Sequence, residues 1–149
     1  MPGFTPDSTC IVAALSAWHQ DHEACATEIE QRLARGEPLR IAAPTLVESY
    51  SVLTRLPRPR RVSPIVALSL LRDTLMQRGS VIALDQGSYT DLLDRAVTQG
   101  TAGGQIYDAV VAACARLAGV RTLLTLNERH FRPFAGDGLM IEVPHSDHG

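Results

Sequence analysis

Short apolar segments alternate with longer helical segments along the chain, and this alternation restricts most strongly the folds open to it. Each apolar segment has roughly four to six residues and precedes a stretch with helical spacing that ends at glycine or proline. Strands that alternate with helices form a mostly parallel sheet covered by helices on both faces. The sequence therefore predicts an α/β fold, one domain over residues 1–149, and a functional site beyond the carboxyl ends of the strands.

The expected elements follow from these patterns. The expected strands are 3–7, 39–44, 80–85, 121–126 and 139–143. The expected helices are 8–18, 21–36, 45–56, 65–79, 88–100 and 105–118. Pro6 weakens the first strand because proline has no backbone N–H to donate to a sheet. The final segment, "VPHSDHG", is expected to be a frayed tail.

The absence of lysine excludes several classes of enzyme. All 14 basic residues are arginine. P-loop proteins, protein kinases, pyridoxal enzymes and Schiff-base aldolases all need a lysine amine, so none of them fits. The net charge of -2 argues against a wholly basic nucleic-acid binder. No apolar run reaches the roughly 18 residues of a membrane span, and no secretory signal pattern is present, so the expected location is the cytoplasm.

The cysteines and one histidine pair are weaker candidates for a metal or redox site. Cys10, Cys25 and Cys114 are odd in number and widely spaced, so buried reduced thiols are expected. His19 and His22 stand three residues apart beside acidic residues, which is compatible with a transition-metal site. A solvated helix start is the competing and favoured interpretation of that pair.

Four polar residues fall at strand ends or in helices that follow strands. They are Asp7, Glu48, Asp108 and Asn127. Each also has a purely structural explanation. Asp7 fits a helix N-cap, and Glu48 fits a capping box that begins at Thr45. Asp108 is favoured near a helix start by the helix dipole, and Asn127 is common in turns.

Asp108 is the hardest of the four to explain structurally. Its helix, 105–118, is composed mainly of Val, Ala, Cys and Leu and is expected to be buried nearly all round. An ionised carboxylate there is costly unless a cation or hydrogen-bond donors meet it. Acids at neighbouring strand ends would supply further oxygen ligands, which suit a hard cation such as Mg²⁺ or Mn²⁺. Carboxylates around such an ion are typical of phosphodiester hydrolysis.

Four segments of the chain resemble a known family. The segments "DSTCIVAAL", "APTLVESYSVLTRL", "GGQIYDAVVAACARLAG" and "LLTLNERHF" are similar in order and spacing to the motifs of PIN-domain ribonucleases. Within that family the chain looks like the VapC-type toxins of bacterial toxin–antitoxin pairs, over almost its whole length. The resemblance implies a three-layer α/β/α PIN-like fold with a mostly parallel sheet.

The same resemblance implies roles for single residues. Asp7, Glu48 and Asp108 match acids that would hold Mg²⁺ or Mn²⁺, and Asn127 matches a fourth position that is often Asp. Thr125 matches a polar residue of the last motif. The implied activity is endonucleolytic cleavage of RNA of the tRNA or rRNA class. The implied partners are a cognate antitoxin protein and a second copy of the chain.

Two residues depart from the family pattern: Pro6 affects only the first strand, whereas Asn127 keeps another function open. Pro6 stands where an apolar residue is expected, and Asn127 removes one negative charge. The neighbouring Glu128 is ranked below Asn127, because it would point elsewhere if the strand continues to Asn127. The alternative is therefore a catalytically weak PIN-like module that binds RNA or protein. A phosphomonoesterase fits poorly, because "DST" lacks the second aspartate of a DxD motif.

An arginine-rich segment and the single tryptophan complete the candidates. "RLPRPRR" places Arg55, Arg58, Arg60 and Arg61 close together. They are equally compatible with contacts to RNA phosphates and with a solvated loop. Trp18 is expected at a subunit or partner interface.

Overall fold

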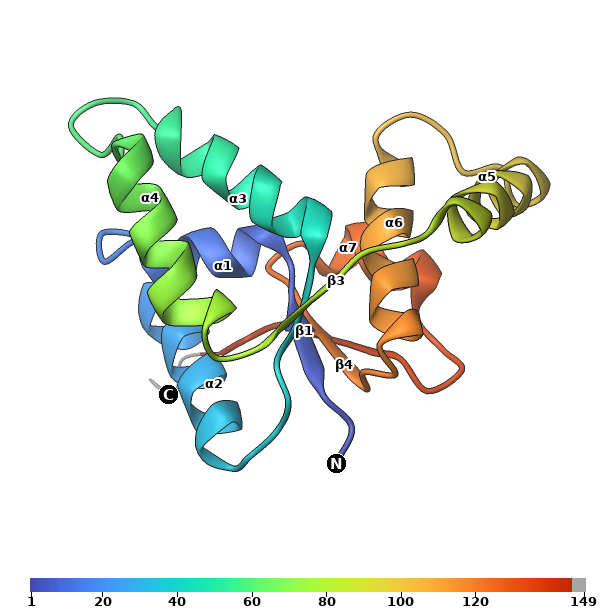
Figure 1. The fold of residues 1–149 in the computed structure, drawn as a ribbon, viewed down its shortest axis with the longest axis horizontal. Helices are drawn as coiled ribbons and strands as arrows, with labels where there is room; N and C mark the ends of the chain where they lie inside the picture. Colours follow the sequence, from blue (N-terminus) through green and yellow to red (C-terminus); the bar gives the residue numbers. More distant parts are fainter. Residues whose placement is uncertain (146–149) are drawn as a thin grey trace.

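Parallel strands form the centre of the molecule (Figure 1). The computed structural model describes residues 1–145. The strands are β1 (Phe4–Pro6), β2 (Arg40–Ala42), β3 (Ser80–Ile82), β4 (Thr122–Leu124) and β5 (Met140–Glu142). β1, β4 and β5 pair in that order, β2 pairs with β3, and every pair is parallel. One parallel bridge between Phe4 and Leu39 joins the two sets, so the spatial order is β3-β2-β1-β4-β5.

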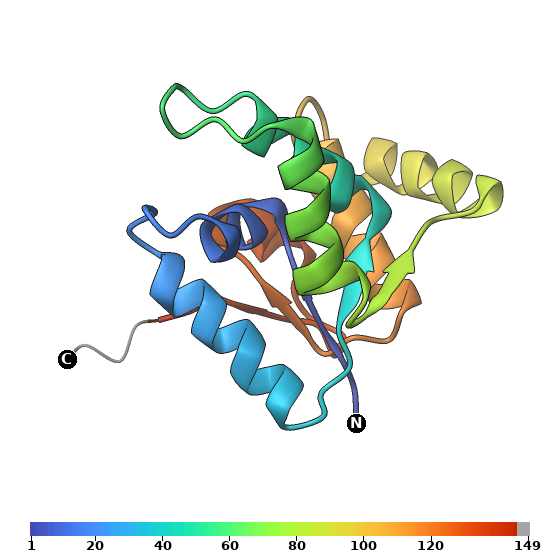
Figure 2. The ribbon, with the colours of Figure 1, turned by 60° about the vertical axis from the view of Figure 1, so that its left-hand side comes forward.

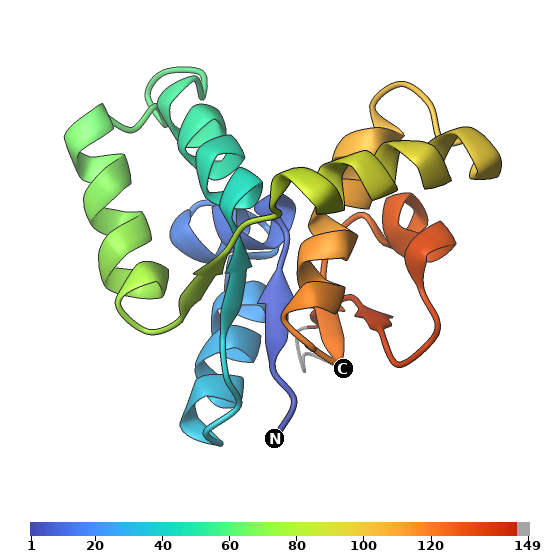
Figure 3. The same ribbon diagram turned by 45° about the vertical axis from the view of Figure 1, so that its right-hand side comes forward.

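Helices cover both faces of the strands, as Figures 1 and 3 show. α1, α2 and α4 lie on one side, and α6 and α7 lie on the other. The helical elements are α1 (Ser8–Leu15), α2 (His22–Ala34), α3 (Ala43–Thr54), α4 (Pro64–Leu71), the π-helical turn η1 (Arg72–Met76), α5 (Gln86–Gln99), α6 (Gln105–Leu117), α7 (Glu128–Phe131) and the 3-10 turn η2 (Arg132–Phe134). The predicted three-layer α/β/α fold is confirmed.

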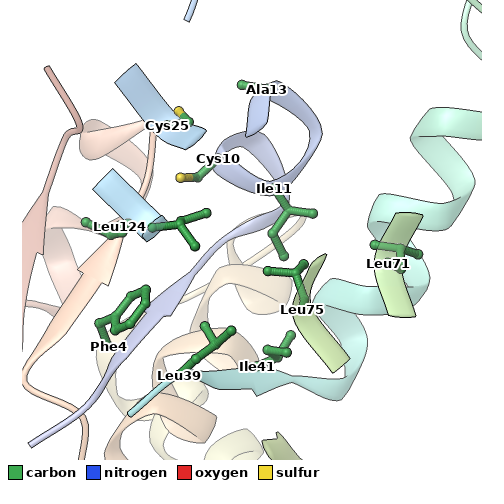
Figure 4. Close-up of a cluster of buried hydrophobic side chains, with 11 residues drawn as sticks. Phe4, Cys10, Ile11, Ala13, Cys25, Leu39, Ile41, Leu71, Leu75 and Leu124 are labelled. Atoms are coloured by element: carbon green, nitrogen blue, oxygen red, sulfur yellow. The ribbon is translucent and has the colours of Figure 1, made fainter. Parts of the chain in front are cut away.

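Successive strand residues divide between two cores. Leu124 packs with α1, α2 and η1 in one buried cluster, which Figure 4 draws, whereas its neighbour Leu123 packs with α6 and α7. In β2, Ile41 and Ala42 divide in the same way. This follows from the two-residue period of strand side chains. A strand buried on both faces carries a continuous apolar run, which is the pattern seen in the sequence.

The three cysteines are buried free thiols, as predicted. Cys10 and Cys25 belong to the cluster of Figure 4 and lie beside each other between α1 and α2. A hydrogen bond with Cys25 and burial raise the pKa of the Cys10 thiol well above its ordinary value. Both residues therefore act as small apolar side chains in this core.

The first strand forms despite Pro6. The Phe4 N–H donates to Pro38 O on the β2 side, and the Asp7 N–H donates to Leu124 O on the β4 side. Because N–H groups alternate in direction along a strand, Pro6 lacks its donor on the β2 side. Pairing with β2 there is limited to the single bridge at Phe4, so the proline leaves the ladder with β4 intact.

Two expectations about helices are wrong. α3 begins at Ala43, two residues earlier than expected, so Thr45 is inside the helix and no capping box forms. The Pro44 ring suits the first turn, where a backbone N–H is not needed. α6 is not buried all round, because Tyr107 is 74% exposed and Leu117 is 60% exposed. The helix is amphipathic, and Asp108 lies half-buried at the border of its apolar face.

The carboxyl ends of β1, β2 and β4 lie at the same end of the parallel sheet and lead into α1, α3 and α7. This arrangement brings residues distant in sequence to one end of the molecule. Within residues 1–145, none of the helices combines the length and apolar content that crossing a membrane requires. The tail predicted for "VPHSDHG" lies largely outside the described residues.

Candidate functional site

The four predicted site residues line one cavity. It has a volume of about 210 Å³, and Asp7, Glu48, Asp108 and Asn127 all contribute to its wall. Asp7 follows β1, Glu48 lies in α3, Asp108 lies in the first turn of α6, and Asn127 precedes α7. The remaining wall residues are Ser8, Thr9, Tyr107, Val111, His130 and Phe131. The site therefore lies beyond the carboxyl ends of β1 and β4, where the fold class places it.

Asp7 is the most buried and most constrained acid of the site. It is 4% exposed. Its Oδ1 accepts hydrogen bonds from Thr9 Oγ1 at 2.6 Å and from the Cys10 N–H at 3.0 Å, and its Oδ2 accepts from Thr125 Oγ1 at 2.6 Å. The bond from Cys10 makes Asp7 the N-cap of α1, so the structural explanation is correct. Capping α1 does not prevent Asp7 from also serving in the site, because the same carboxylate lines the cavity.

Two threonines tie this carboxylate to the segment after β4. Besides donating to Asp7, Thr125 Oγ1 accepts from the Asn127 N–H at 2.9 Å. Thr9 Oγ1 accepts from the Leu126 N–H at 3.0 Å. Each hydroxyl therefore donates to the carboxylate and accepts from the backbone. The position of Asn127 is thus coupled to that of Asp7 through Thr125.

The electrostatics of the site reflect crowded acids. Burial raises the pKa of Asp7, although hydrogen bonds from Thr125, Thr9 and Cys10 oppose the shift; Glu48 adds to it. Burial also raises the pKa of Asp108, with His130 opposing the shift and Glu48 again adding to it. A cation placed among these carboxylates would favour their ionised forms and offset the cost of burying them.

Sequence reasoning missed Thr9 and His130. Thr9 follows the N-cap and looks like an ordinary helix-start residue. His130 belongs to a helix of only four residues, which the sequence pattern does not reveal. Its signal was the three-residue spacing from Asn127, which places both residues near the same cavity once the chain turns into α7. His130 is the basic residue of the cavity wall, and it lies close enough to Asp108 to affect its pKa.

The donor set fits a hard divalent cation by its chemistry. Three carboxylates and one amide face the cavity, and its wall contains no arginine within the described residues. As the side chains stand in residues 1–145, no three His, Cys, Asp or Glu residues are gathered tightly enough to hold a metal ion. Asp7 is fixed by its three donors, whereas Glu48 is exposed on α3 and has rotatable bonds free to bring its carboxylate inward.

Of two other cavities, one adjoins the acidic cavity and the other lies apart from it. One of about 460 Å³ adjoins the acidic cavity and shares Ser8, Thr9, Glu48 and Asn127 with it. Another of about 350 Å³ lies between α5, α6 and residues 133–137, and none of the predicted site residues lines it. The functional candidate is therefore the acidic cavity together with its neighbour.

The histidine pair does not form a second metal site. His19 Nδ1 accepts from the Asp21 N–H at 3.0 Å, and His22 Nδ1 bonds with the Ala13 carbonyl oxygen at 3.0 Å. Each ring is thus used to fix the α1–α2 connection. Among the described residues, neither histidine belongs to a metal-binding group.

Comparison with known proteins assigns the chain to one family. The model of the PIN domain family matches residues 5–136, so the chain belongs to the PIN domain family. It is 38% identical over 138 residues to Ribonuclease VapC40 of Mycobacterium tuberculosis, and this alignment covers 93% of this chain and 95% of that protein. It is 33% identical over 115 residues to Ribonuclease VapC27 of the same species, and this alignment covers 76% of this chain and 77% of that protein.

Solved structures show the same fold at lower identity. The DNA-bound VapBC of Salmonella typhimurium aligns with a TM-score of 0.66 and 19% identity, over 96% of this chain and 98% of that one. VapC20 of M. tuberculosis, described as a Sarcin-Ricin loop cleaving toxin, aligns with a TM-score of 0.60 and 17% identity. The alignment covers 81% of this chain and 87% of that chain.

The raised pKa of Asp108 predicts a stability effect in metal-free protein. A raised pKa means that the folded state binds the proton more tightly, so stability contributed by this group falls as pH rises above about 4. Asp108→Asn should therefore raise the melting temperature at pH 7 in EDTA, and the gain should vanish below about pH 4.

The control is Asp91→Asn, which removes an exposed carboxylate from α5 and should give no such pH-dependent gain. Thermal unfolding followed by circular dichroism measures both variants. A clear decrease in the melting temperature of Asp108→Asn at pH 7 would show that Asp108 has a stabilising partner, and would contradict the cost of burying its charge beside Glu48.

Proposed function

We propose that the chain is a metal-dependent endoribonuclease that hydrolyses RNA phosphodiester bonds as the toxin of a toxin–antitoxin pair. The observation that carries the proposal is the meeting of Asp7, Glu48, Asp108 and Asn127 in one cavity of a PIN domain. The similarity to proteins named Ribonuclease VapC40 and Ribonuclease VapC27 supports it.

Asp7, Glu48 and Asp108 would hold Mg²⁺ or Mn²⁺, because carboxylate oxygens suit hard cations. When bound, the ion lowers the pKa of a water molecule, orients the phosphate and stabilises the negative charge of the transition state. The absence of lysine is no obstacle, since this chemistry needs neither a lysine nor a covalent nucleophile.

The side chains around the cavity have distinct tasks. Asp7 supplies a fixed carboxylate, because three donors define its orientation. Glu48 is the exposed and movable acid, and in this proposal it would accept the proton that the attacking water loses. Asn127 offers a neutral amide that orients water or phosphate without adding negative charge. His130 beside Asp108 reduces the repulsion among the acids.

The RNA is proposed to belong to the tRNA or rRNA class, on the basis of the family resemblance. The alternative is a catalytically weak PIN-like module that binds RNA or protein. Two observations favour that alternative: Asn127 replaces an acid, and the carboxylates of residues 1–145 are not closed around one point. RNA cleavage that requires divalent metal separates the two functions, because a binding module would retain RNA without cutting it.

Asp108→Asn should reduce RNA cleavage by more than about 100-fold, because losing a metal ligand costs more than losing a residue that merely orients one. Cleavage of bulk RNA by the wild-type chain should stop in EDTA and return with Mn²⁺ or Mg²⁺. Gel analysis of a total RNA digest measures the rates.

Asp91→Asn is again the matched control, since it makes the same chemical change on exposed α5 and should cleave at the wild-type rate. Undiminished cleavage in EDTA would exclude the metal mechanism. Binding of RNA without any cleavage in Mn²⁺ would establish the alternative module instead.

The proposed partner is a small antitoxin that inserts a basic side chain into the acidic cavity. An arginine there would replace the charge of the metal and satisfy the same carboxylates by bidentate hydrogen bonds. The cavity wall has no arginine of its own in the described part of the chain, so its acids are available to an external one. A homodimer is also proposed, and exposed Ile65, Val66 and Leu68 of α4 offer apolar surface for it.

The antitoxin mechanism predicts competition with metal. Mn²⁺ should bind the free chain and bind the antitoxin complex at least about tenfold more weakly, because both ligands use the same carboxylates. Isothermal titration of Mn²⁺ into each sample measures this. Equal affinities would exclude the inserted arginine, but would leave the nuclease proposal intact, since an antitoxin can also block access of RNA at the rim.

A further inference from the structure

Trp18 lies on the surface beside a basic loop and is not used by the core. It is 44% exposed in the α1–α2 connection. The guanidinium carbon of Arg60 lies 4.3 Å from the centre of its ring, and the His19 ring is 5.5 Å away at a tilt of 42°. An exposed aromatic ring flanked by an arginine plane and a second ring is a surface on which a planar group can stack.

The loop that carries Arg60 is basic and well supported. It joins α3 to α4 and projects from the same side of the molecule as the α1–α2 connection (Figure 2). Arg61 Nε donates to Leu56 O at 2.9 Å, and the Val62 N–H donates to Leu53 O at 3.0 Å. Within residues 1–145, no carboxylate forms an ion pair with the loop arginines, which are Arg55, Arg58, Arg60 and Arg61. Their charges are therefore available to an external anion.

The cavity that adjoins the acidic site extends to the residue next to Trp18. His19, the neighbour of Trp18, lines the cavity of about 460 Å³ together with Gln20 and Asp21. The same cavity shares Ser8, Thr9, Glu48 and Asn127 with the acidic site. A chain that occupies both cavities would extend from the acids to His19, next to Trp18. Without a metal ion Asp21 and Glu48 repel phosphate in this cavity, so the phosphates beyond the cleavage position would contact the arginine loop.

We infer that the Trp18 ring, together with Arg60, stacks an unpaired base of single-stranded RNA next to the cleavage position, while the arginine loop holds the adjoining phosphates. This inference rests on the proposed function and names the form of RNA that the same site takes. Stacking requires a base released from a duplex, so a paired strand would lose this contact. The subsite thus selects loops and single strands over RNA helices.

Trp18 is the only tryptophan of the chain, so its fluorescence reports directly on stacking. The experiment adds a short oligoadenylate to the full-length Asp108→Asn chain, which binds without cutting. Tryptophan emission should be quenched by the single strand and much less by a blunt RNA duplex of equal length. Anisotropy of a labelled oligoadenylate then measures affinity for Trp18→Ala, Trp18→Phe and Arg60→Gln.

Trp18→Ala should bind the single strand about tenfold more weakly, whereas Trp18→Phe retains most of the affinity. Arg60→Gln should weaken binding and lower the salt dependence by about 0.7 in log–log slope, because one phosphate contact is lost. The matched control is Arg121→Gln, which makes the same change at the opposite end of β4 and should leave the affinity unchanged.

Two failures are distinguishable. If the wild-type chain cleaves RNA, but Trp18 emission is unaffected by oligoadenylate and Trp18→Ala binds it normally, the stacking subsite is wrong and the nuclease stands. Emission that changes with protein concentration instead of RNA would assign Trp18 to self-association and also overturn the inference. If the wild-type chain does not cleave RNA in Mn²⁺, the proposed function itself fails.

Discussion

The buried carboxylate of Asp7 is the interaction on which the site depends. Its two oxygens accept from Thr9, Cys10 and Thr125, and so join the start of α1 to the segment that follows β4. Thr125 in turn receives the Asn127 N–H. These contacts fix the carboxyl ends of β1 and β4 and the start of α1 relative to one another beside the acidic cavity. A single carboxylate thereby caps α1 and faces the acidic cavity in a fixed orientation.

This arrangement has an electrostatic cost in the absence of a cation. Asp7 and Asp108 both have raised pKa values, and burial is the largest cause for each. The three hydrogen bonds reduce the cost at Asp7 but leave the repulsion from Glu48. We propose that this uncompensated charge makes the cavity selective for cations, whether from a metal ion or from the side chain of an antitoxin. The loop between α3 and α4 carries the opposite charge, and its Arg60 lies over the Trp18 ring.

The sequence predicted the fold and the meeting of the acids, because both follow from local patterns. Apolar runs identified the strands, and the rule that sites form at the carboxyl ends of parallel strands brought Asp7 and Asn127 together. The start of α3 was misplaced because Thr45 and Glu48 imitate a capping box, whereas Pro44 begins the helix earlier. Thr9, His130 and the contact of Arg60 with Trp18 depend on tertiary packing between distant segments, which no local pattern encodes.

The most direct test of the central role of Asp7 is the Mn²⁺ affinity of two variants of its buried partner. Thr125→Val preserves the shape of the side chain but removes the hydroxyl that donates to Asp7 Oδ2, whereas Thr125→Ser retains it. By isothermal titration calorimetry, Thr125→Val should bind Mn²⁺ roughly 10–100-fold more weakly than the wild type, and Thr125→Ser should bind it nearly as well. Wild-type affinity in Thr125→Val would contradict the account, because the orientation of Asp7 would then not matter for metal binding.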